Sequence, residues 1–96
     1  MNTEVQELLN IIKTLRSPNG CPWDKEQTFQ SLTPYIIEEA YELVDAMEAT
    51  QTGHYDNLKE ELGDVLLHVV MLAAMAEENQ AFDFSAVAKT ISEKIF

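Results

Sequence analysis

A run of twelve residues from Val65 to Ala76 is apolar except for His68, and no other feature limits the possible folds as strongly. The run is shorter than the ~20 residues that a membrane-spanning helix needs. On a helix it would leave no polar face for water, so other helices must surround it. Because a chain of 96 residues supplies few helices, we expect a second copy to pack along this one, in a homodimer or a dimer of dimers.

The rest of the chain shows helical spacing of its apolar residues, and no strand-like alternation is long enough to predict a sheet. Thr33 and Pro34 are expected to be the cap and the first residue of a helix. The predicted helices are about Thr3–Arg16, Thr33–Ala49, Asn57–Asn79 and a last one from Asp83 and Ser85 to the C-terminus, with a loop at Ser17–Asp24 and a short turn near Thr28–Leu32. We therefore predict an all-α fold over residues 1–96 as a single domain, in which dimerisation completes a four-helix bundle.

The composition of the chain is strongly acidic, with 6 lysines and arginines against 17 aspartates and glutamates and a formal net charge of −11. Such a chain repels nucleic-acid backbones and anionic membranes, so we expect neither as a partner. A phosphorylated ligand would need a cation to bridge it to the protein. The single cysteine, Cys21, is typical of a reducing compartment, and the N-terminal residues do not resemble a signal peptide. These features predict a cytoplasmic protein.

Acidic residues on the second and third predicted helices are spaced so that carboxylates lie one turn apart. The second helix carries Glu38, Glu39, Glu42 and Asp45, and the third carries Glu61 and Asp64. A short connection makes neighbouring helices antiparallel, so these groups can face each other. Converging carboxylates repel, and Mg²⁺ or Mn²⁺ with oxygen ligands would remove that repulsion.

A solvated acidic face is the alternative interpretation of these residues, and the spacing alone leaves it open. Asp64 favours the metal, because it leads directly into the apolar run, with His68 one turn further on the same face. Gly63 favours it too, since a glycine inside a helix costs ~1 kcal/mol relative to alanine unless a close approach or a ligand needs the space. For His68 we expect an interior histidine with satisfied hydrogen bonds. The ligand patterns of zinc, EF-hand and ferritin-like di-iron sites and the Walker A motif do not occur in this sequence.

Two segments together resemble the MazG-type nucleoside triphosphate pyrophosphohydrolases. The matching residues are Leu15-Arg16, the stretch Asn19-Gly-Cys-Pro-Trp-Asp-Lys-Glu-Gln-Thr-Phe29, Glu38-Glu39-x-x-Glu42 and Glu61-Leu-Gly-Asp64. The resemblance covers nearly the whole chain and implies a magnesium-dependent, α-helical enzyme that assembles its sites in dimers. Such an enzyme converts a nucleoside triphosphate and water into the monophosphate and pyrophosphate, and we expect it to clear surplus or non-canonical nucleotides.

The same resemblance implies roles for individual residues. Glu39, Glu42, Glu61 and Asp64 would be the metal ligands, and Glu38 would hold a second ion or orient the attacking water. The candidate phosphate contacts are Arg16, Lys25 and Lys94, which could equally be surface residues that keep the protein soluble. Trp23 either flanks the base or packs at the end of the bundle. Longer relatives continue with a basic segment after the last helix, where this sequence stops at Phe96, so we expect phosphate binding to rely on fewer side chains here or on a partner subunit.

Two other functions fit the sequence. One is a non-catalytic helical module whose acidic surface binds a basic partner. The other is a specialised member of the superfamily that acts on a single substrate, such as dUTP or phosphoribosyl-ATP. Stabilisation by magnesium with nucleotide would separate the enzyme from the module, and a panel of nucleotides would separate the two kinds of enzyme.

Overall fold

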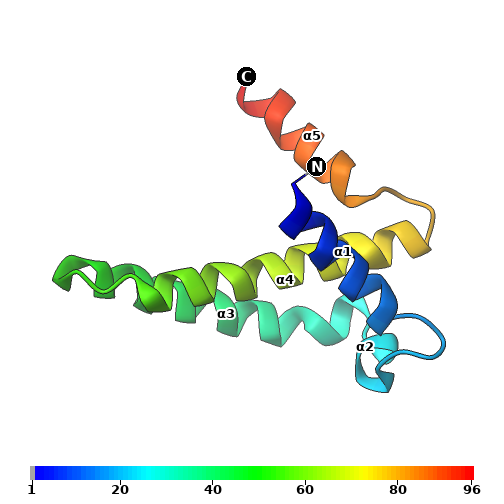
Figure 1. Ribbon diagram of the computed structural model, residues 1–96, viewed down its shortest axis with the longest axis horizontal. Coiled ribbons are helices and arrows are strands. Elements are labelled where there is room, and N and C mark those ends of the chain that lie inside the picture. The colour runs from blue at the N-terminus through cyan, green and yellow to red at the C-terminus, as the bar shows by residue number, and fades with distance from the viewer. Residues whose placement is uncertain (1) are drawn as a thin grey trace. The chain divides into compact units, whose positions relative to one another are not determined.

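A computed structural model describes residues 2–96, and that part of the chain is helical with no β-strand (Figure 1). The elements are α1 (Thr3–Leu15), α2 (Pro22–Glu26), α3 (Phe29–Ala49), the 3₁₀ helix η1 (Thr50–Thr52), α4 (Asp56–Glu78) and α5 (Phe84–Ile95). The predicted all-α class is therefore confirmed. The four-helix bundle and the dimer remain predictions.

The chain forms two compact units, and α4 belongs partly to each. Unit 1 holds the described residues up to Thr28 and those from Val70 to Phe96, and unit 2 holds Phe29–Val69. Unit 2 is a helical hairpin in which α3 and the first part of α4 run side by side in opposite directions (Figure 1). A single domain over residues 1–96 stays a prediction.

Local capping accounts for the helix ends that the sequence predicted well. The side chain of Asn2 accepts a hydrogen bond from the Val5 amide at 3.0 Å and begins α1. Asp83 accepts one from the Ala86 amide at 2.9 Å and begins α5, as predicted. Capping depends on residues three positions apart, so a sequence pattern is enough to locate it.

The predicted start of the second helix is wrong. Instead of beginning at Thr33 and Pro34, α3 begins at Phe29 and contains Pro34, so residues 29–32 of the expected turn are helical. The hydroxyl of Thr33 donates to the Phe29 carbonyl at 3.4 Å rather than capping a helix. Leu32 is only 1% exposed, so burial stabilises the extra turns despite the proline.

The predicted loop at Ser17–Asp24 also needs correction, because its last residues belong to α2. Pro22 takes the first position of this short helix. An N–H at that position would have no acceptor within the helix, so proline loses no hydrogen bond there, and its fixed φ angle suits a helix.

The apolar run of α4 is covered by its own chain only in its second half. In unit 1, Val70, Met71 and the residues from Ala73 to Ala76 are buried, together with Ile12 of α1. In unit 2, Leu66, Leu67 and Val69 stay more than a third exposed. The expectation that other helices surround the whole run is thus met within this chain for Val70–Ala76 alone. No helix within residues 2–96 is long and apolar enough to cross a membrane.

Unit 2 presents a stripe of exposed apolar side chains along α3. Ile37, Tyr41 and Val44 recur at helical spacing and are 53%, 72% and 49% exposed, and Leu62 on α4 is 51% exposed. Two helices bury too little surface to be stable alone, so an apolar stripe of this size is typical of an interface. It supports the predicted homodimer.

We expect Tyr41→Glu to weaken self-association, because a charge placed in an apolar interface loses its hydration. Light scattering coupled to size-exclusion chromatography should give the mass of two chains or a multiple for the wild type and a shift toward one chain for the variant. Gln51→Glu, which adds the same charge at an exposed position of η1, is the control. A monomeric wild type at micromolar concentration would contradict the predicted dimer.

Candidate metal centre

Four carboxylates of unit 2 converge from the two helices of the hairpin. Glu39 and Glu42 lie one turn apart on α3, and Glu61 and Asp64 lie one turn apart on α4. One carboxylate oxygen of each residue lies within 4.8 Å of the corresponding oxygens of the other three. The structure thus brings together the four residues that the sequence predicted to act as one group.

The connection between α3 and α4 sets the register that opposes these residues. Glu42 and Glu61 are equally far along the chain from the peptide bond between Gln51 and Thr52, which lies within this connection, and so are Glu39 and Asp64. Because both helices rise 1.5 Å per residue, equal distances place the pairs opposite each other.

A glycine allows the turn to be this short. Gly53 follows η1 with φ of 83°, a left-handed conformation that other residues adopt at a cost. Its amide donates to the Thr50 carbonyl at 3.0 Å, and the Thr50 hydroxyl donates to the Met47 carbonyl at 2.6 Å. These bonds satisfy groups at the end of α3 and let the chain reverse.

The electrostatics of the cluster oppose full ionisation. Loss of hydration raises the pKa of Glu39, Glu42 and Glu61 above the ordinary value of 4.5, and this is the largest cause for each. Neighbouring negative charges raise the pKa values further, notably that of Glu39 beside Glu42 and that of Glu42 beside Glu61. In the absence of a cation, the folded protein therefore binds protons at this site more readily than the unfolded chain does.

The donor set fits a hard divalent cation. Glu39 Oε2 and Glu61 Oε2 are buried and lack a hydrogen-bond partner among the described residues, and a buried acceptor without a partner is costly. Four carboxylates in one place supply oxygen ligands only, which Mg²⁺ and Mn²⁺ favour over nitrogen or sulfur. The four residues are thus suited to hold such an ion.

The space around Gly63 corrects one sequence argument. A Cβ atom built at this position meets nothing within 4 Å, so close packing against another part of the chain is not the reason for the glycine. Room for a ligand or for a second copy remains as an explanation.

The other predicted site residues have different surroundings. Glu38 is exposed on α3, and its negative charge contributes to the raised pKa of Glu39 and Glu42. His68 is half-buried in unit 2. The predicted substrate contacts Arg16, Trp23, Lys25 and Lys94 all belong to unit 1.

Each of these four residues of unit 1 has its own environment. Arg16 donates hydrogen bonds to protein acceptors. Lys25 Nζ donates to the Pro18 carbonyl at 2.8 Å, and Lys94 is exposed in the last turn of α5. Trp23 is 50% exposed, so in this chain it is not the core plug that one interpretation expected.

A small cavity beside the carboxylates includes a residue that the sequence argument did not select. The cavity measures about 280 Å³ and is lined by Glu42, Asp45, Ala46, Asn57 and Glu61.

 Asn57 lies one turn before Glu61 on α4, and Asp45 one turn after Glu42 on α3. Asn57 could have been predicted from the register of the hairpin, because that register places it nearly opposite Asp45.

Comparisons with known proteins identify the family of this chain. The model of the MazG nucleotide pyrophosphohydrolase domain matches residues 27–96. The chain therefore belongs to the MazG nucleotide pyrophosphohydrolase domain family, as the sequence motifs predicted.

Particular relatives are similar over nearly the whole chain. A Thermotoga maritima protein named nucleoside triphosphate pyrophosphohydrolase/pyrophosphatase MazG is 50% identical over 90 residues, which is 94% of this chain and 34% of that protein. The Escherichia coli K12 nucleoside triphosphate pyrophosphohydrolase is 47% identical over 93 residues, 96% of this chain and 34% of that protein. The chain thus spans about a third of the length of these curated relatives.

We expect Glu61→Gln to raise the melting temperature of the metal-free protein at pH 7.5 by several degrees. Because the pKa of Glu61 is raised in the folded state, its carboxyl group stabilises that state below pH 4.5. This stabilisation is lost as the pH rises through the raised pKa. Glutamine carries no charge, so the variant does not undergo this loss of stability as the pH rises. Thermal unfolding in EDTA from pH 4.5 to 8 measures it, and Glu60→Gln, an exposed neighbour, controls for net charge. Equal curves for the two variants would contradict the raised pKa.

We expect Gly63→Ala to stabilise the metal-free chain, because alanine favours a helix by ~1 kcal/mol and its Cβ has open space. For a domain of this size, that corresponds to a rise in melting temperature of about 4–8 °C. A lower melting temperature would show that something other than this chain, such as a second copy, fills the space.

Proposed function

We propose that this chain hydrolyses nucleoside triphosphates to the monophosphate and pyrophosphate, with a divalent cation held by Glu39, Glu42, Glu61 and Asp64. The observation that carries the proposal is the convergence of these four carboxylates within 4.8 Å. Membership of the MazG domain family and the names of the relatives support the reaction. Because the chain spans only part of those relatives, its activity has to be measured on the chain itself.

A bound cation would offset the repulsion between this acidic protein and a triphosphate. A chain with a net charge of −11 repels a triphosphate, and the four carboxylates would repel it most strongly. When bound, Mg²⁺ supplies positive charge that neutralises the phosphates and the departing pyrophosphate. Mn²⁺ offers similar coordination chemistry and is expected to substitute.

The reaction requires a water molecule to lose a proton as it attacks. The water oxygen forms a bond to the α-phosphorus, and the bond from that phosphorus to the bridging oxygen breaks, so the electron pair leaves with pyrophosphate. We assign the proton to the carboxylate of Glu38, which is exposed and close enough to influence Glu39 and Glu42 electrostatically.

The biological purpose we propose is removal of surplus or non-canonical nucleotides. Among the predicted substrate contacts, Trp23 is proposed to stack on a base, and half of its surface is exposed. Lys25 and Lys94 carry positive charge at exposed positions and are proposed to contact phosphate. Stacking and charge discriminate weakly between bases, which suits a broad substrate range.

A panel of nucleotides with Mg²⁺, Mn²⁺ or EDTA tests the proposal, with pyrophosphate release as the readout. Activity that requires a divalent cation is expected, with turnover of both altered and common bases. Turnover of dUTP or phosphoribosyl-ATP alone would indicate a specialised enzyme. No turnover, and no stabilisation by Mg²⁺ with nucleotide, would indicate an acidic interaction module.

We expect Glu42→Gln to lower kcat/KM by roughly 100-fold, since loss of a ligand weakens metal binding at least as much as loss of its supporting groups. Circular dichroism should show that helical content is retained. Glu48→Gln, which removes the same charge from an exposed position of α3, should stay near wild-type activity. Unchanged turnover in Glu42→Gln would remove this residue from the site.

A further inference from the structure

The guanidinium of Arg16 is committed to acceptors within unit 1. Its Nε donates to Glu78 Oε2 at 2.6 Å, and its Nη2 donates to Glu78 Oε1 at 2.9 Å. Its Nη1 donates to the Asp24 carbonyl and, at 3.5 Å, to the Gln27 carbonyl. All three nitrogens therefore have protein partners, and two of them form a bidentate pair with one carboxylate.

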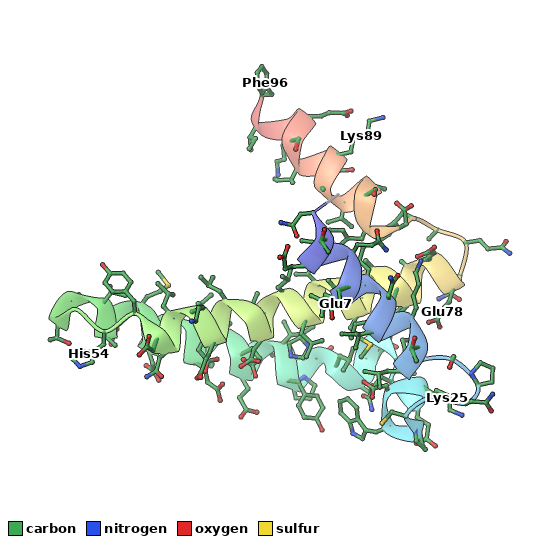
Figure 2. The ribbon with its side chains drawn as sticks, viewed as in Figure 1. Glu7, Lys25, His54, Glu78, Lys89 and Phe96 are labelled. Atoms are coloured by element: carbon green, nitrogen blue, oxygen red, sulfur yellow. The ribbon has the colours of Figure 1, made fainter. Side chains whose placement is uncertain are left out.

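These bonds join three helices through one side chain. Arg16 is the C-cap of α1, Asp24 and Gln27 lie at the C-terminal end of α2, and Glu78 is the last residue of α4, where Figure 2 labels it. A guanidinium at the carbonyl end of α2 also compensates the partial negative charge of that end.

Burial sets Arg16 apart from a surface cation. Its side chain is 9% exposed, whereas that of Glu78 is 48% exposed. A buried guanidinium needs its partners, because an unpaired charge away from water is strongly unfavourable. The nearby pair of Lys13 and Glu77, separated by 3.4 Å, is about half exposed on both sides and lacks this constraint.

The segment that Arg16 holds is closely fitted to the end of α1. The Cys21 amide donates to the Leu15 carbonyl at 2.9 Å, and a Cβ at Gly20 would clash with that same carbonyl. The segment of residues 17–28 also carries Trp23 and Lys25, which are predicted to contact nucleotide.

We infer that Arg16 is a positioning residue, which holds the segment of residues 17–28 in its folded conformation through Glu78, and that it does not itself bind phosphate. The inference rests on the proposed function only in linking this segment to nucleotide binding. It differs from the role that the family resemblance implied, in which Arg16 contacts phosphate.

The two roles predict opposite effects of Glu78→Gln. If Arg16 bound phosphate, loss of the competing carboxylate would free the guanidinium and lower KM. If Arg16 positions the segment, loss of the bidentate pair loosens residues 17–28, and KM rises while kcat changes little. A purely global destabilisation would instead lower the active fraction, and hence apparent kcat, without raising KM.

The experiment uses the full chain with Glu78→Gln, Arg16→Lys and the control Glu77→Gln, a neighbouring exposed acid. Trp23 is the only tryptophan, so quenching of its fluorescence by acrylamide reports on this segment alone. Kinetics are measured with the best nucleotide from the panel. We expect stronger quenching and a KM raised about fivefold in both variants, the size of effect that a half-exposed ion pair allows, and neither change in the control.

Several results would overturn the inference. A lower or unchanged KM in Glu78→Gln would do so, and so would wild-type behaviour of Arg16→Lys, since charge alone would then suffice. If the chain turned over no nucleotide, the proposed function would fail, while the quenching measurement would still decide the positioning role. Wild-type quenching in both variants would reject it. Because Arg16→Lys keeps the charge, it provides a folded variant should Glu78→Gln prove unstable.

Discussion

Mutual repulsion among four carboxylates is the constraint around which unit 2 is built. The oxygens of Glu39, Glu42, Glu61 and Asp64 lie within 4.8 Å of one another, and loss of hydration together with like charge raises the pKa of the three glutamates. An arrangement that opposes its own ionisation is unfavourable for folding by itself. It becomes favourable with a bound cation, which is why the proposed function depends on a metal.

The hairpin keeps this arrangement in place because its connection is short. Gly53, in the left-handed conformation, lets α4 start soon after α3 ends, and the register of the two helices follows from that length. Residues added to this connection would let α4 start at a different height along α3, and the acidic pairs would no longer lie opposite each other. The turn therefore matters to the site as much as the ligands do.

Basic residues are few in this chain, and Arg16 shows that the role of a basic residue depends on the groups that contact it. A basic residue in a phosphate-handling family is readily interpreted as a phosphate contact. The contacts of Arg16 with Glu78 and the carbonyls of α2 instead favour a structural use. Residue type could not distinguish these roles, because Glu78 lies 62 positions away in the sequence.

Local patterns in the amino-acid sequence determined the helical class, the cap at Asp83 and the spacing of the acidic pairs, because each depends on residues within one turn. Tertiary structure alone decided that α3 begins at Phe29, since burial of Leu32 outweighs the proline at position 34. It also decided the partners of Arg16 and the exposure of Trp23. These features depend on contacts between segments that are distant in the sequence, and a local sequence pattern contains no information about such contacts.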